Sequence, residues 1–143
     1  MSATNAVETD VLELVFQAVT WPDFAEDDTT SPLTALFVSL HTADPTETGT
    51  QTSSEATYTS YARQSVARTT GGWAVSGNTV DNVAAVTFPE ATGGSETITH
   101  FGIGQNTSGA GNLYFSGALD STLAVSTNVQ PEFAIGALNI TLD

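Results

Sequence analysis

From Leu33 to Asp143, apolar and polar residues alternate, and residues that favour turns interrupt the alternation about every 8 to 12 positions. A period of two places successive side chains on opposite faces of a β-strand. In residues 80–88, for example, Val80, Val86 and Phe88 fall on one face. Short strands at this spacing are typical of sandwiches and barrels. The pattern therefore predicts an all-β fold, mainly an antiparallel β-sandwich or barrel-like arrangement, with about eight or nine strands.

Two segments stand out from this alternation. Residues 33–41, LTALFVSLH, are apolar on both faces and are predicted to form a central strand. Residues 42–57 are rich in Thr, Ser and Gly and lack a large apolar side chain, so a long exposed loop is expected there. Near Gly136 the apolar face changes parity, which predicts a bulge or a tight turn. The other strands are expected in residues 58–68, 71–80, 82–88, 96–104, 112–119, 122–127 and 129–142.

Residues 5–20 have a different period, in which apolar side chains recur at the spacing of one helical face. Asn5 followed three residues later by Glu8 forms a capping-box pattern at the start. One short N-terminal amphipathic helix is therefore predicted. Its apolar stripe must pack on the domain or on a neighbouring subunit, and the sequence leaves both open. The stripe consists of Val7, Val11, Leu14, Val15 and Ala18.

Residues 21–32, WPDFAEDDTTSP, combine two prolines with four carboxylates and show no periodicity. They predict a solvated acidic loop. A calcium site is the alternative, but the regular spacing of a calcium-binding loop is missing. We expect a single globular unit in which residues 1–32 form the helix and the acidic loop and residues 33–143 form the β domain. The carboxylates of the acidic loop are Asp23, Glu26, Asp27 and Asp28.

The chain has 16 acidic residues, two arginines and no lysine, which gives a formal net charge of −14. Nucleic acids and anionic membranes repel such a protein, so neither is expected as a partner. At about 1 M salt the Debye length falls to about 3 Å, and like charges on a surface then repel each other only weakly. The composition therefore supports the hypothesis of a halophilic protein, with an ordinary acidic surface as the alternative.

Residues that carry out chemistry are few. No cysteine is present, and His41 and His100 lie in different predicted strands. No G-x-S-x-G motif occurs, and the glycine-rich turns lack the lysine of a phosphate-binding loop. His41 is expected to cap the turn that follows it, and His100 to be a half-buried strand residue with one hydrogen bond. We therefore predict no catalytic residue, no cofactor and no metal site; two histidines with one carboxylate are the alternative left open.

Both basic residues, Arg63 and Arg68, lie in the stretch YTSYARQSVART, residues 58–69. Their odd spacing places them on opposite faces of a strand. The simpler interpretation is two surface ion pairs, each worth well under about 1 kcal/mol. The alternative is that one guanidinium group clamps a loop or a neighbouring subunit.

Several short motifs follow one another in order between residues 33 and 143: LHTADP, YAR, the hairpin around Trp73, TFPEATGG, THFGIG and GALNITLD. In this order they resemble a family of small virion proteins of tailed phages, described as tail-fibre or head-decoration proteins. The resemblance implies a β-rich structural subunit without catalytic residues. The strong acidity and the acidic loop after the helix depart from the family pattern.

We predict a capsid decoration or vertex protein of cement or turret type, because no heptad shaft or collagen-like stalk is present. It is expected to assemble in the host cytoplasm and to lie on the virion surface as a homo-oligomer, with the major capsid protein or tail proteins as partners. The alternative is a tail fibre or a module that binds a host receptor or glycan, with loop 42–57 and Tyr58, Tyr61 or Trp73 at its tip. The predicted interface residues are Val11, Leu14, Val15, Trp21, Phe24, Arg63 and Arg68.

Overall fold

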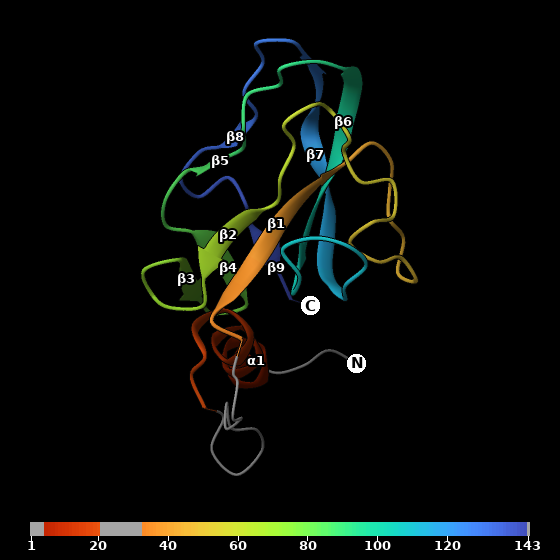
Figure 1. The fold of residues 1–143 in the computed structure, drawn as a ribbon. Helices are drawn as coiled ribbons and strands as arrows, with labels where there is room; N and C mark the ends of the chain where they lie inside the picture. Colours follow the sequence, from red (N-terminus) through yellow and green to blue (C-terminus); the bar gives the residue numbers. More distant parts are fainter. Residues whose placement is uncertain (1–4, 21–32, 143) are drawn as a thin grey trace. The chain divides into compact units, whose positions relative to one another are not determined.

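The computed structural model describes residues 5–20 and 33–142, and within them it contains one helix and nine strands (Figure 1). The described strands form sheets of order β2-β1-β6-β7, β3-β4-β9 and β5-β8. The pairs β1–β6, β6–β7, β3–β4 and β4–β9 are antiparallel. The predicted fold, mainly antiparallel β with one short N-terminal helix, is confirmed. The elements are α1 (Asn5–Gln17), β1 (Ala35–His41), β2 (Gln64–Ala67), β3 (Trp73–Ser76), β4 (Thr79–Asn82), β5 (Val86–Thr87), β6 (Ser95–Gly104), β7 (Leu113–Ser126), β8 (Glu132–Phe133) and β9 (Ile140–Thr141).

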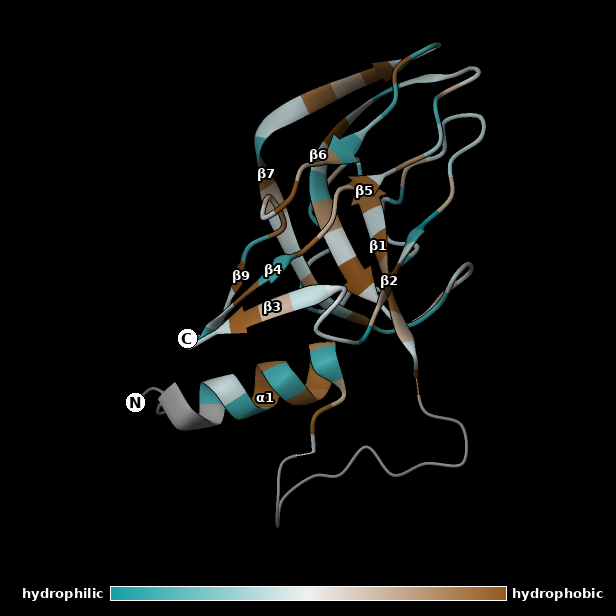
Figure 2. Cartoon of the chain, turned by 90° about the vertical axis from the view of Figure 1, so that its left-hand side faces the viewer, coloured by the Kyte–Doolittle hydropathy of each residue, from teal (hydrophilic) through white to brown (hydrophobic). Residues whose placement is uncertain are grey.

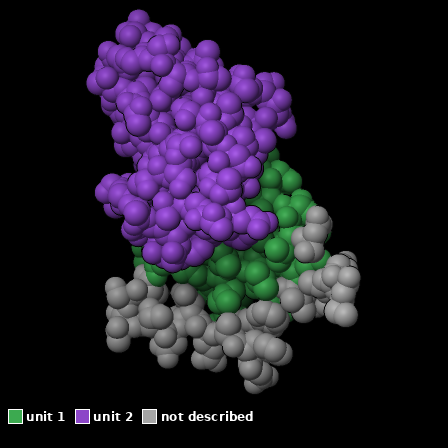
Figure 3. All heavy atoms as spheres, turned by 90° about the vertical axis from the view of Figure 1, so that its right-hand side faces the viewer, with its two compact units in different colours: residues 1–35, 66–85, 133–143 green, residues 36–65, 86–132 purple. Residues whose placement is uncertain are grey.

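The chain divides into two compact units, which Figure 3 colours separately. Unit 1 comprises residues 1–35, 66–85 and 133–143, and unit 2 comprises residues 36–65 and 86–132. Each unit thus combines segments that are distant in the sequence. The division predicted at residues 32 and 33 stays a prediction, because the acidic segment 21–32 lies outside the described residues. No helix in the described part of the chain is long and apolar enough to cross a membrane.

In unit 1, α1 packs against β3 and β4, and Figure 2 shows the helix running alongside β3. Leu12 and Phe16 are fully buried, and the Phe16 ring meets the Trp73 ring edge to face with 4.8 Å between centroids. Burying an apolar side chain of this size stabilises the fold by about 1.5–3 kcal/mol. Buried Leu12 and Phe16 thus hold the helix to the sheet, together with hydrogen bonds from Thr9 to the Gly77 carbonyl and from Gln17 to the Trp73 carbonyl.

The apolar stripe predicted for the helix is not its most deeply buried line. Val11, Leu14 and Val15 are only half-buried, whereas Leu12 and Phe16 lie in the core. Apolar residues occupy so many positions of this helix that the period alone does not select the buried face; the large rings of Phe16 and Trp73 select it. The Asn5 cap and the Val7 side chain lie outside the described residues.

Two turns in unit 1 follow from glycines. Gly77 and Asn78 join β3 to β4, and Gly77 has φ of +62°, which suits the first central residue of a two-residue hairpin turn. Gly136 has φ of +72°, and the Ala137 N–H donates to the carbonyl of Ala134. Of the bulge or tight turn predicted near Gly136, the structure thus confirms the tight turn.

In unit 2, β1 lies between β2 and β6 in the four-stranded sheet, as predicted for a central strand. Its side chains Leu36, Val38 and Leu40 are buried, as are Ile98 and Ile103 of β6. Apolar burial from these two neighbouring strands contributes to the core of the unit, together with Phe88 and Val125. The two strands predicted in residues 112–119 and 122–127 form one strand, β7.

The strand predicted over residues 58–68 is wrong for most of its length, because β2 contains only Gln64–Ala67. The Tyr58 and Tyr61 rings meet edge to face at 5.3 Å, and the Tyr61 ring stacks on Phe88 at 6.2 Å. Aromatic residues are common in strands, so their spacing imitated a strand pattern. Here they are spaced to fill the core of unit 2 instead.

Candidate functional site

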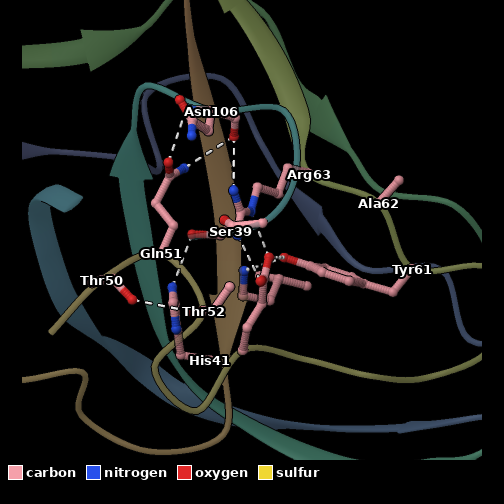
Figure 4. Close-up of polar contacts among 12 residues, drawn as sticks. Ser39, His41, Thr50, Gln51, Thr52, Tyr61, Ala62, Arg63 and Asn106 are labelled. Carbon is pink, nitrogen blue, oxygen red and sulfur yellow. Dashed lines mark hydrogen bonds and ion pairs between the residues drawn. The ribbon is translucent and has the colours of Figure 1, made fainter. Parts of the chain in front are cut away.

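The most concentrated polar arrangement in unit 2 surrounds Arg63, which precedes β2 (Figure 4). Arg63 is 7% exposed. Its Nε donates to Glu55 Oε1 at 2.6 Å and its Nη2 donates to Glu55 Oε2 at 2.7 Å. A two-point ion pair of this kind fixes both side chains more tightly than a single contact. Glu55 belongs to loop 42–57, so Arg63 fastens the end of that loop.

The same guanidinium group holds a second loop, residues 105–112, which joins β6 to β7. Nη1 of Arg63 donates to the Asn106 carbonyl and Nη2 donates to the Gly109 carbonyl, each at 2.8 Å. Irregular loops leave backbone carbonyls without partners in a ladder. Arg63 gives both of these carbonyls a donor, and Gln51 Nε2 also donates to that of Asn106.

Tyr61 completes the arrangement around Glu55. Its hydroxyl donates to Glu55 Oε1 at 3.0 Å and accepts the Leu40 N–H at 3.1 Å. Burial raises the pKa of Tyr61 well above its ordinary value, and the nearby Glu55 carboxylate adds to the shift. The phenol therefore remains a hydrogen-bond donor to the carboxylate. This links loop 42–57 to β1.

Gln51 ties the two loops together independently of Arg63. It is fully buried; its Oε1 accepts the Asn106 N–H at 2.8 Å and its Nε2 donates to the Asn106 carbonyl at 3.3 Å. A Cβ atom at Gly104 or at Gly111 would collide with the Gln51 side chain. Glycine is therefore required at both positions for the amide to reach the loop backbone.

His41, the last residue of β1, contacts loop 42–57 and is fully buried. Its Nδ1 is 2.8 Å from the Ser53 carbonyl, which only accepts, so Nδ1 carries the proton. Nε2 then accepts the Ser39 hydroxyl at 2.8 Å. Burial lowers the pKa of His41. The predicted role in capping the following turn is wrong, because His41 instead anchors the backbone of Ser53.

The Ser39–His41 contact has the atom order of a nucleophile and its base, but both residues have 0% exposure. A substrate needs access to the hydroxyl, which this position does not give. His100 in β6 is half-buried, with its Nδ1 2.8 Å from the Thr99 hydroxyl, as predicted for a strand residue with one hydrogen bond. His41 thus acts as a part of the fold.

Arg68 occupies a different setting, in unit 1. It is 8% exposed, and its Nε and Nη2 donate to the carbonyls of Val15 and Leu14, each at 2.6 Å. Nη1 donates to the Leu33 carbonyl at 2.5 Å. The last carbonyls of a helix have no partner within it and carry a partial negative charge. The last turn of α1 contains no basic residue, so Arg68 provides the cation from outside the helix.

The surface position predicted for the two arginines is therefore wrong. Arg63 does form an ion pair, with Glu55, and it holds two loops, which agrees with the alternative of a loop clamp. Both guanidinium groups are buried, because each satisfies several backbone carbonyls of its own unit at once. Of the three aromatic residues proposed for the tip of a glycan-binding loop, Tyr58 is 3% exposed and Trp73 is fully buried, so neither lies at such a tip; Tyr61 is half-buried. Of the other predicted interface residues, Val11, Leu14 and Val15 are half-buried, and Trp21 and Phe24 lie outside the described residues.

Metal ligands do not gather within residues 5–20 and 33–142: no group of three or more His, Cys, Asp or Glu side chains there is placed to hold an ion. The alternative of two histidines with a carboxylate finds no support in that part of the chain. The candidate calcium ligands of the acidic loop, residues 23–28, lie outside the described residues.

Comparison with known proteins identifies a family. The sequence model of a family described as Podophage GP4 fiber I protein gp80 matches residues 2–141. No curated protein matches the sequence. The matched range includes both units, both arginines and the helix.

Proposed function

The chain belongs to the family described as Podophage GP4 fiber I protein gp80, and because of this membership we propose that it is a tail-fibre subunit of a tailed virus. It is a structural virion protein of the tailed-phage type. The family match, which extends over residues 2–141, is the single observation that carries the proposal. The match favours the fibre alternative over the capsid decoration or vertex protein preferred from the sequence.

The preference for decoration rested on the lack of a heptad shaft or collagen-like stalk. A fibre does not require either in every subunit, since other proteins of the appendage can supply length. We therefore propose tail proteins and further copies of this chain as its partners, in place of the major capsid protein. The half-buried face of α1 formed by Val11, Leu14 and Val15 is the proposed contact surface.

A fibre subunit works through the shape of its surface, and the interior of unit 2 supports that role. Arg63, Gln51 and His41 hold the backbone of loops 42–57 and 105–112 in fixed positions. Loops that are ordered before binding lose less conformational entropy when they meet a partner. The polar network is thus suited to keeping an exterior surface rigid, and no reaction is proposed for it.

The proposal is tested on purified virus particles. Antibody fragments raised against this chain should label the tail appendages in electron micrographs, and particles that lack the chain should lose density there. Labelling of the capsid, or loss of a capsid feature, would instead favour the decoration role. A particle that lacks another fibre component serves as the control for general loss of the tail.

A further inference from the structure

A surface groove of about 550 Å³ lies in unit 2, outside the Arg63 network. This volume falls within the roughly 300–1,000 Å³ of sites for small ligands. One wall comes from loop 42–57, with Asp44, Thr46 and Glu47. His100 and the β7 residues from Leu113 to Ala118 make the rest.

The floor of the groove follows from the pairing of β6 with β7. His100 pairs with Ala118 and Gly102 pairs with Ser116, so these four residues share one face of the sheet. Ser116 and Ala118 have small side chains, which leaves this face hollow beside the imidazole. Over Gly102 the face is filled, because a Cβ atom there would collide with His41, Leu113 and Ser39.

A bulge presents an aromatic ring at one end of this floor. Ile103 pairs with Phe115 and Gly104 pairs with Leu113, so Tyr114 has no Cα partner across the strands. Such an extra residue bends its strand and redirects its side chain. Tyr114 is 44% exposed, and its hydroxyl donates to Gln105 Oε1 at 2.6 Å. The ring is therefore held in one orientation while much of it remains open to solvent.

The opposite wall offers hydrogen-bond acceptors. Asp44 and Glu47 are exposed, and Asp44 Oδ1 accepts the Thr46 N–H at 2.8 Å, which fixes the carboxylate. Thr46 has φ of +64°, a conformation that a β-branched residue rarely adopts. The loop keeps this conformation while its later part is anchored through Gln51 and His41. The wall is therefore a prearranged part of the groove.

We propose that this groove binds a neutral saccharide. A sugar ring has an apolar face of C–H groups and an edge of hydroxyls, and the groove offers the Tyr114 ring for the first and the Asp44 and Glu47 carboxylates for the second. Ser116 and His100 provide further polar contacts on the floor. Acidic sugars are disfavoured, because the protein has a net charge of −14 and both carboxylates lie on the wall.

Where the saccharide comes from rests on the proposed function. On a tail fibre, it would be part of a glycan on the host surface. Binding of the sugar itself does not depend on where the protein lies in the virion. The two proposals can therefore fail separately. A chain found on tail fibres that binds no saccharide would remove this inference alone, and a saccharide-binding chain found on the capsid would remove the fibre assignment alone.

The test uses the full chain against a panel of neutral oligosaccharides built from glucose, galactose, mannose, rhamnose and N-acetylglucosamine, with sialylated and sulfated glycans as comparators. Titration should give saturable binding to at least one neutral member. Tyr114→Ala should weaken that binding by at least about tenfold, as truncation of an anchoring aromatic residue does. Tyr114→Phe should retain most of it, because the ring remains. Ser116→Trp should abolish binding by filling the groove.

Ile135→Ala is the matched control, since Ile135 is 71% exposed and belongs to unit 1. It should bind as the unmodified chain does. Melting curves establish that each variant is folded, and Ala118→Trp replaces Ser116→Trp if the latter does not fold. The inference is overturned if no neutral saccharide binds, if acidic glycans or peptides bind in preference, or if folded Tyr114→Ala and groove-filling variants bind unchanged.

Discussion

Each compact unit of this protein contains one buried arginine, and the two are used differently. In unit 2, Arg63 meets a carboxylate at two points and two loop carbonyls besides. In unit 1, Arg68 donates hydrogen bonds to the carbonyls of Val15 and Leu14 at the end of α1 and to the carbonyl of Leu33. One cation closes loops around an ion pair, whereas the other completes a helix terminus.

The contrast explains how a chain with so few cations uses them. A guanidinium group has five N–H donors in a rigid plane, so it satisfies several oxygens from different segments. Irregular backbone is where such oxygens accumulate: loops 42–57 and 105–112 in unit 2, and the helix end in unit 1. The carboxylates on the surface then need no paired cation, since water and salt solvate them.

The largest effect is expected from Arg63→Ala, in unit 2. It leaves Glu55, whose side chain is 15% exposed, with an uncompensated charge; the Gly109 carbonyl loses its Arg63 donor and the Asn106 carbonyl keeps only Gln51. Removing one partner of a buried ion pair costs about 3–5 kcal/mol. Urea unfolding measures this loss. The double variant Arg63→Met with Glu55→Leu should recover much of it, and a double variant as unstable as the single one would contradict the importance of the pair.

Arg68→Ala in unit 1 should cost about 2–3 kcal/mol, because the carbonyls of Val15, Leu14 and Leu33 lose a charged donor. Its specific mark is on the helix: the far-ultraviolet circular dichroism of α1 should weaken. Arg63→Ala measured in the same way should leave the helical signal intact. Arg68→Lys keeps the charge but lacks the planar set of N–H donors. Its helical signal should lie between those of the unmodified chain and Arg68→Ala. A full helical signal in folded Arg68→Ala would contradict the capping role.

Much of the sheet structure was predictable, because both signals are local: an apolar run on both faces marks β1, and alternation marks the hairpin β3–β4. The sites were less predictable. Arg63 and Asn106 are 43 residues apart and Arg68 and Leu14 are 54 apart, and no period links such positions. One signal was present: α1 has no basic residue in its last turn, so a cation from elsewhere is expected there. No sequence signal predicted the groove. Its walls come from loop 42–57 and β7, which are distant in the sequence, and its shape depends on the bulge at Tyr114.

Acid should affect unit 2 through His41. Its folded pKa is lowered below the ordinary 6.5, so the unfolded chain takes up the proton first as the pH falls. Stability is thus complete above pH 6.5 and decreases below it, until the folded pKa is passed. We expect this decrease to be smaller than the effect of either arginine substitution. Unfolding free energies in urea between about pH 8 and pH 5 measure it.

His41→Asn is the control for this pH dependence, because the amide nitrogen can replace Nδ1 as the donor to Ser53 without titrating in this range. Carboxylates also titrate towards pH 5, and their contribution is common to both proteins. The difference between the two curves therefore isolates His41. Parallel curves between pH 7 and pH 5 would show that the histidine is not coupled to folding.

Salt should change the stability that depends on the acidic surface but not the stability that depends on the buried arginines. Its effect on the losses caused by the arginine substitutions should be the smallest of the effects predicted here. If the protein is halophilic, the unmodified chain becomes more stable between about 0.1 M and about 1 M NaCl, since screening weakens repulsion among its carboxylates. The losses caused by Arg63→Ala and Arg68→Ala should change by less than about 0.5 kcal/mol over the same range, because buried charges are screened little. The measurement is urea unfolding of all three proteins at both concentrations. A loss for either variant that vanishes in molar salt would place that arginine among ordinary surface ion pairs, and it would restrict the buried-cation argument to the other unit.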